Sequence, residues 1–197
     1  MPKLLSLALV GASLGRERGN LTELGDTRSG KLVRTLKIPG VVRLSSLSED
    51  GALFFTVSPE VQTWDAASGK MVRSFAPEDS ELYSAGFSGD SSQIALGWET
   101  GRIDIYDVRT GGLIRCLDAG VGGITATAFS PNGSHLVSGN ENGTKVWQIR
   151  RNSAEPAAIL EGHVGSVKSV AFTATGDRVE LGGKCPLVSR RPSKRPG

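Results

Sequence analysis

The chain has few of the residues that build disulfide-rich, metal-binding or membrane-spanning proteins. Its only cysteines are Cys116 and Cys185, too few for a disulfide framework. Neither cysteine, and neither of the two histidines, lies at ligand spacing from a suitable partner, so the sequence predicts no metal site and no cofactor. No apolar run approaches the ~20 residues that a membrane-spanning helix needs. We therefore expect no contact with a membrane.

Acidic residues are absent from the end of the chain. Residues 184–197 carry five basic side chains and no acid, and without those five charges the net charge of +3 becomes −2. The body is therefore mildly acidic, and we interpret the basic tail as a solvated, disordered segment. A nuclear-import signal or a segment that contacts nucleic acid is the alternative. We expect the protein in the cytoplasm, with the nucleus as the second compartment.

Aromatic residues are also scarce, at 6% of the chain, whereas glycine is abundant, with 26 residues. This composition favours many short strands joined by tight turns. An apolar strand followed by a similar turn occurs four times, with steps of 40, 42 and 43 residues between the landmark residues Leu47, Phe87, Phe129 and Phe172. A second landmark recurs in phase, with steps of 39, 42 and 41 residues, at Asp26, Asp65, Asp107 and Gln148. Two landmarks with one period indicate a repeat architecture.

One repeat, residues 124–160, shows the expected local structure. ITATAFS alternates and ends in the turn sequence Ser-Pro-Asn-Gly; SHLVSG ends in Asn-Glu-Asn-Gly; TKVWQI and the weaker PAAIL follow. Four short strands joined by a few residues each predict an antiparallel meander. Such a sheet cannot bury both faces alone, so copies must stack face to face, as the sheets of a propeller do.

These landmarks resemble the WD-repeat β-propeller family over about residues 20–180. The residues that carry the resemblance are the AFSPNG turn, Trp64-Asp65, its variant Tyr106-Asp107, and Gly162-His163. The resemblance implies an all-β, β-propeller-type array of four-stranded antiparallel blades, about three full ones with partial blades at both ends. The expected units are a partial blade at 1–36, blades at 37–75, 76–117 and 118–160, a partial blade at 161–183, and the tail at 184–197.

The resemblance also implies a buried network in which a histidine, a serine or threonine, an aspartate and a tryptophan are hydrogen-bonded. It assigns structural roles to Trp64, Asp65, Asp107, Trp147 and His163. No repeat keeps the whole network, because Ile38 and Gly120 stand where the histidines paired with Trp64 and Trp147 would be. Each missing partner forfeits about 1 kcal/mol of hydrogen bonding, so we expect a divergent member.

The function implied is a non-catalytic protein–protein interaction scaffold, an adaptor or a regulatory subunit. Acidic residues recur in the connections between repeats and in the second hairpin turns, at Glu78, Asp79, Glu81, Glu99, Asp118, Glu141 and Glu161. In the family these loops lie on one face and commonly take part in binding. We therefore expect this acidic face to bind a basic or polar segment of another protein.

Two alternative functions remain open. The segment GASLG at 11–15 matches the G-x-S-x-G elbow of serine hydrolases, with Ser13 as the nucleophile. The sequence after GASLG does not predict the helix that this motif requires, and the position of Ser13 favours a turn after an N-terminal strand. For the same N-terminal stretch we prefer a strand to a secretory signal peptide. The second alternative is nucleic-acid association through the basic tail. We expect neither to be the main activity.

The arginines Arg34, Arg73 and Arg115 each stand eight residues after a landmark aspartate, in the last strand of a repeat. Charge on an exposed edge strand discourages aggregation, and this is the interpretation we prefer.

The repeat count predicts that the chain does not close a ring in the usual way. We expect second to fourth strands at about 4–10, 20–24 and 31–36, and a first and second strand at 167–173 and 178–181. This arrangement suggests a truncated or alternatively spliced product whose open ends favour self-association. The alternative is a four-bladed ring in which the strand at 167–173 pairs with the N-terminal three.

Overall fold

The computed structural model describes residues 7–10, 21–26, 29–58, 60–75, 80–149, 154–160 and 165–183, and every regular element in them is a β-strand. The first sheet contains β1 (Leu7–Val10), β2 (Leu21–Asp26) and β3 (Leu32–Lys37). The second contains β4 (Leu44–Leu47), β5 (Leu53–Ser58), β6 (Glu60–Asp65) and β7 (Met71–Phe75). The third contains β8 (Leu82–Phe87), β9 (Gln93–Trp98), β10 (Arg102–Asp107) and β11 (Leu113–Asp118).

The fourth sheet contains β12 (Ala126–Phe129), β13 (His135–Asn140), β14 (Gly143–Ile149) and β15 (Ala154–Leu160). The fifth contains β16 (Val167–Phe172) and β17 (Val179–Gly183). All strand pairs are antiparallel and join neighbours in sequence. The structure is thus an all-β array of meanders, and we call the five sheets the first to fifth blades.

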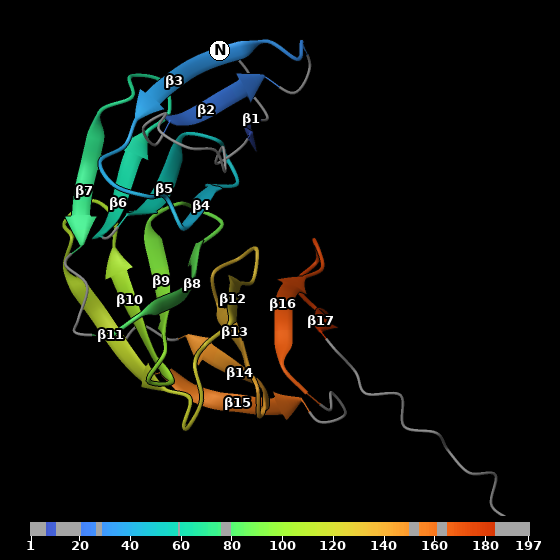
Figure 1. Ribbon diagram of the computed structural model, residues 1–197. Coiled ribbons are helices and arrows are strands. Elements are labelled where there is room, and N and C mark those ends of the chain that lie inside the picture. The colour runs from blue at the N-terminus through green and yellow to red at the C-terminus, as the bar shows by residue number, and fades with distance from the viewer. Residues whose placement is uncertain are drawn as a thin grey trace, which may run out of the picture.

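The blades follow one another around an open arc (Figure 1). The first strands of the second to fifth blades, β4, β8, β12 and β16, lie on the inner side, and the last strands β7, β11 and β15 lie on the outer side. β12 packs between β8 and β16. β16 pairs with β17 and not with β1, which pairs only with β2. The four-bladed ring, in which the strand at 167–173 would join the N-terminal sheet, is therefore not the arrangement adopted.

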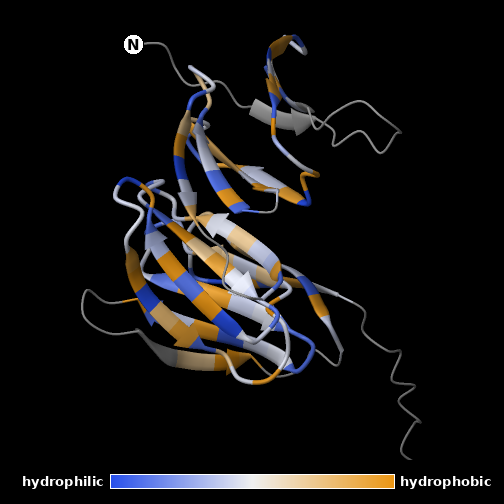
Figure 2. Cartoon of the chain, turned by 60° about the vertical axis from the view of Figure 1, so that its left-hand side comes forward, coloured by the Kyte–Doolittle hydropathy of each residue, from blue (hydrophilic) through white to orange (hydrophobic). Residues whose placement is uncertain are grey.

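The core fills the space between neighbouring blades. Apolar and polar residues alternate along the strands (Figure 2), so each blade offers an apolar face to the next. Ile103 and Ile105 of β10 are fully buried in one cluster with Phe129 and Trp147 of the fourth blade. A close approach at β9 supports this packing, because a side chain added at Gly97 would lie 2.6 Å from Ile124 Cγ2.

The turn after each first strand is built by its own side chains. Ser88 Oγ donates to Asp90 Oδ1 at 2.7 Å, and the Asp90 carboxylate also accepts the Ser92 N–H at 3.1 Å. The Ser88 hydroxyl and the Ser92 N–H stabilise the carboxylate and lower the pKa of Asp90. Ser130 bonds Asn132 Oδ1 at 2.9 Å in the fourth blade. These bonds explain why a serine followed two residues later by Asp or Asn recurs with the repeat.

The repeated arginines connect each blade to the next. Arg34 of β3 donates from Nη2 to the carbonyl oxygen of Ala67 at 2.6 Å, and Arg73 of β7 donates from Nε to that of Arg109 at 3.0 Å. Each acceptor lies in the turn before the last strand of the following blade. The interpretation that these arginines protect an exposed edge strand is therefore incomplete, because their side chains also hold adjacent blades together. Arg115 of β11 occupies the equivalent sequence position in the third blade, and the corresponding turn of the fourth blade lies outside the described residues.

Candidate functional site

The connections between blades and the second hairpin turns lie at one end of the strands, and we call this side the loop face. Four of the seven predicted acidic residues are described there: Glu81, Glu99, Asp118 and Glu141, all exposed. The other three, Glu78, Asp79 and Glu161, lie outside the described residues. The described acids differ in their availability to a partner.

Glu81 and Glu99 already interact within the chain. Glu81 Oε1 accepts from Arg43 Nη2 at 2.8 Å, a bond that raises the pKa of Arg43. Glu99 neighbours Tyr83, whose pKa is raised by desolvation first and then by the nearby Glu99 charge. Exposed pairs of this kind contribute little to stability. They do reduce the net charge that Glu81 presents to another protein.

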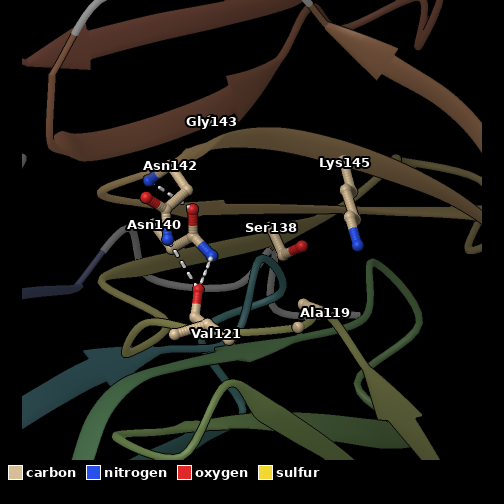
Figure 3. A pocket seen from close by; sticks show the side chains of 8 residues that line it. Ala119, Val121, Ser138, Asn140, Asn142, Gly143 and Lys145 are labelled. Carbon is tan, nitrogen blue, oxygen red and sulfur yellow. Dashed lines mark hydrogen bonds between the residues drawn. The ribbon is translucent and has the colours of Figure 1, made fainter.

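Asp118, Asn140 and Asn142 fix the loop between the third and fourth blades. Asp118 Oδ1 accepts the Gly120 N–H at 2.8 Å. Asn140 and Asn142 both donate side-chain N–H groups to the carbonyl oxygen of Val121, at 3.3 and 2.8 Å (Figure 3). The Val121 side chain is nevertheless 85% exposed. The chain thus holds a large apolar side chain in water on a loop fixed by three polar groups.

A pocket of about 260 Å³ lies beside this loop, and Figure 3 shows it between the third and fourth blades. It is lined by Ala119, Gly120, Val121, Ser138, Asn140, Asn142, Gly143 and Lys145. Ser138 Oγ, at its base, accepts from Trp147 Nε1 at 2.9 Å, and Lys145 Nζ lies 5.8 Å from the centre of the Trp147 ring. Gly120 replaces the expected histidine, which leaves an open pocket there in place of an imidazole.

Trp64 is the other tryptophan whose expected histidine partner is replaced. Trp64 Nε1 donates to Thr56 Oγ1 at 2.9 Å, as the resemblance implies. Ile38, in place of the histidine, is 1% exposed and fills the space with apolar atoms. Two repeats therefore keep the tryptophan–hydroxyl bond, one with Gly120 and a pocket beside it and one with the buried Ile38.

Asp65 and Asp107 act in the outer turns. Asp65 Oδ1 accepts from Ser68 Oγ at 2.6 Å and from its N–H at 2.7 Å, and these bonds lower the pKa of Asp65. Asp107 Oδ1 accepts the Thr110 N–H at 2.6 Å and its hydroxyl at 2.8 Å, which lower the pKa of Asp107 in the same way. Each carboxylate closes the turn into the last strand of its blade.

One buried carboxylate was not predicted. Asp104 is 0% exposed in the middle of β10, where Oδ2 accepts from Trp98 Nε1 at 2.9 Å and Oδ1 from Arg102 Nε at 2.7 Å. Burial and then the Asp104 charge raise the pKa of the Cys116 thiol on the neighbouring strand. In the sequence Asp104 alternates with Ile103 and Ile105, which predicts only that it lies on the opposite face of the sheet from them. The pattern does not indicate that Trp98 covers the carboxylate on that face.

Several predicted residues lie outside the described part of the chain. These are His163, Ser13 of the hydrolase alternative, and the tail at 184–197. Among the described residues, no group of three or more His, Cys, Asp or Glu side chains is placed to hold a metal ion. The same residues contain no helix long and apolar enough to cross a membrane.

Comparison with known proteins agrees with this geometry. Residues 111–148 match the family described as WD domain, G-beta repeat. The WD repeat-containing protein SL1-17 of Schistosoma mansoni is 24% identical over 61% of this chain and 40% of its own length. The U3 small nucleolar RNA-associated protein 15 of Schizosaccharomyces pombe is 26% identical over 74% of this chain and 31% of its own.

A chain in the crystal structure of the mitotic checkpoint complex has the same fold, with a TM-score of 0.71 and 20% identity over 83% of this chain and 53% of that one. The chain spans about half or less of the length of the proteins it matches. Repeated tryptophan–hydroxyl bonds, four-stranded antiparallel blades and these matches lead to one conclusion. The chain has the fold of a WD-repeat β-propeller and contains a WD repeat at residues 111–148, in a divergent form.

Proposed function

We propose that the chain is a protein–protein interaction scaffold that recognises its partner through the loop face between the third and fourth blades. The observation that carries the proposal is Val121, an apolar side chain 85% exposed on a loop fixed by Asn140 and Asn142. A loop whose backbone is ordered before binding loses less conformational entropy on association. The adjacent pocket of about 260 Å³ gives room for a side chain of the partner.

The exposed acids set the chemistry of the proposed partner. Glu99 and Glu141 lie in second hairpin turns, and a side chain added at Gly122 would lie 3.4 Å from Glu141 Oε1, which places this carboxylate beside the Val121 loop. A basic or polar segment with an apolar side chain for Val121 suits this surface. Complementary charge mainly raises the association rate and the specificity.

Photo-crosslinking tests the face directly. A crosslinking amino acid at position 121 should capture partner proteins in cells, and the double change E99K/E141K should reduce their yield about tenfold, because it reverses the local charge. Isolated partners should associate more slowly with the reversed chain and more slowly as salt is raised.

The matched control places the same crosslinker at Ile159, which is 64% exposed on the outer strand β15. Equal capture of the same proteins from both positions, unaffected by E99K/E141K, would show that the loop face does not select the partner.

We further propose self-association through the strand edges at the two ends of the arc. Among the described strands, β1 and β17 are edge strands of the two sheets that have fewer than four strands. An unpaired edge can add a strand from another chain. Sedimentation should show a weight-average mass that rises with concentration; a constant mass near 20.7 kDa would contradict this part of the proposal.

The proposed compartments are the cytoplasm and the nucleus. One relative is named for a small nucleolar RNA, and the basic tail suits nuclear import. Fluorescence microscopy of the tagged chain, with and without residues 184–197, distinguishes the two compartments.

A further inference from the structure

The opposite end of the strands carries a second pocket, of about 350 Å³. The turn at 130–134 precedes β13 and the turn at 141–142 follows it, so this pocket and the loop face lie at opposite ends of that strand. Three of the four repeat landmarks, Phe87, Phe129 and Phe172, line it, one from each of the third to fifth blades. The repeat period therefore brings three aromatic rings to one place.

Two acceptor oxygens meet at the same pocket. A Cβ atom added at Gly89 would lie 2.4 Å from the Pro131 carbonyl oxygen and 3.2 Å from Glu49 Oε2. Both oxygens thus converge on the bare Cα of Gly89 from two different blades. No hydrogen bond from the described residues reaches either of them. Acceptors gathered without a donor favour a group that brings N–H donors and positive charge.

The charged side chains around this pocket are negative, like the Glu49 carboxylate. Asp50 and Asp90 lie in the equivalent turns of the second and third blades, and their carboxylates are ionised acceptors of hydroxyl bonds at 2.6 and 2.7 Å. In the fifth blade Asp177 is adjacent to Arg178, so that turn adds no net charge. The rim is therefore acidic over aromatic walls.

We propose that this pocket binds the guanidinium group of an arginine on a partner protein. A guanidinium stacks on aromatic rings and directs five N–H donors in a plane, so it can reach a carboxylate and a carbonyl from one position. A lysine ammonium is compact and strongly hydrated and stacks poorly. A purely apolar side chain would leave the Glu49 carboxylate and the Pro131 carbonyl without donors. The arginine pocket is separate from the loop face, and either proposal can fail alone.

The test uses three short peptides and amide chemical shifts of the full-length chain. The peptides are acetyl-glycyl-X-glycinamide, where X is arginine, lysine or citrulline, the neutral analogue of arginine. The arginine peptide should shift the amide signals of Gly89 and Ser130 saturably, and the citrulline peptide should bind at least about tenfold more weakly. Equal binding of the lysine or the citrulline peptide would overturn the assignment to a guanidinium.

Two variants locate the site. E49Q, on an exposed side chain, should weaken the arginine peptide about tenfold, and F172L, which keeps apolar volume and removes a ring, about threefold. The matched control E60Q removes the same charge from an exposed side chain at the opposite end of β5 and should leave binding unchanged. If E49Q has no effect, if E60Q weakens binding equally, or if the shifts occur at Val121 instead of Gly89, the pocket does not bind arginine.

Discussion

Replacement of Asp104 by alanine should lower the free energy of unfolding by about 2–3 kcal/mol, the upper part of the usual cost of leaving a buried hydrogen-bond donor unsatisfied. The carboxylate is 0% exposed and accepts from Trp98 and Arg102, so D104A removes the bonds that it accepts from a buried indole N–H and from a partly buried guanidinium. Urea denaturation followed by tryptophan fluorescence measures the loss. It is a large part of the ~5–15 kcal/mol that stabilises a typical domain.

Two further variants separate the charge from the shape. D104N keeps an oxygen that can accept from Trp98 and loses only the ion pair with Arg102, so its cost should be intermediate. D118A removes an exposed carboxylate that bonds one backbone N–H and should cost about 1 kcal/mol. A D104A chain as stable as D118A would mean that the buried network contributes nothing to the third blade.

Replacement of Gly101 by alanine should destabilise the chain by more than about 3 kcal/mol, the range of severe backbone and packing defects. The added Cβ would lie 1.8 Å from the carbonyl oxygen of Gly120, and the φ of +85° is unfavourable for any residue with a side chain. The backbone at 119–121 must move to relieve this contact. We therefore expect G101A also to shift the amide signal of Val121 and to weaken crosslinking from position 121.

Gly133 provides the control for the dihedral alone. It has a similar φ of +69°, and a Cβ added there meets nothing within 4 Å. G133A should therefore cost only about 1 kcal/mol. Equal losses in G101A and G133A would show that the loop at 119–121 yields without cost, and the proposal of a fixed Val121 would then be wrong.

The repeat landmarks show which contacts can be predicted from the local sequence. Ser88 and Asp90 bond within one turn, as do Asp107 and Thr110, and such contacts depend only on residues two or three positions apart. The resemblance predicts that Trp64 and Trp147 bond hydroxyl groups on the neighbouring strand, and both do so. The hairpin register places Phe54 and Leu136 opposite the two tryptophans, and the hydroxyl residue lies two positions further along that strand, on the same face.

The acidic loop residues show which contacts cannot be predicted from the local sequence. All seven were predicted as equivalent, but equivalence in sequence did not show that Glu81 is paired with Arg43, 38 positions earlier in the chain. Nor did it show that Asn140 and Asn142 hold Val121. Contacts between blades depend on the distance and angle at which neighbouring sheets stack, which no pattern within one repeat specifies.

The sequence by itself determined the all-β class, the period and the turns, because each rests on contacts within a hairpin or on the alternation of side chains along a strand. Only the tertiary structure decided that Asp104 is buried, that Arg34 and Arg73 join adjacent blades, and that a pocket lies beside Gly120. It also gathered Phe87, Phe129 and Phe172 around the oxygens of Glu49 and Pro131. The physical reason is that these groups come from different blades, and stacking brings them together across about 40 residues of chain for each blade crossed.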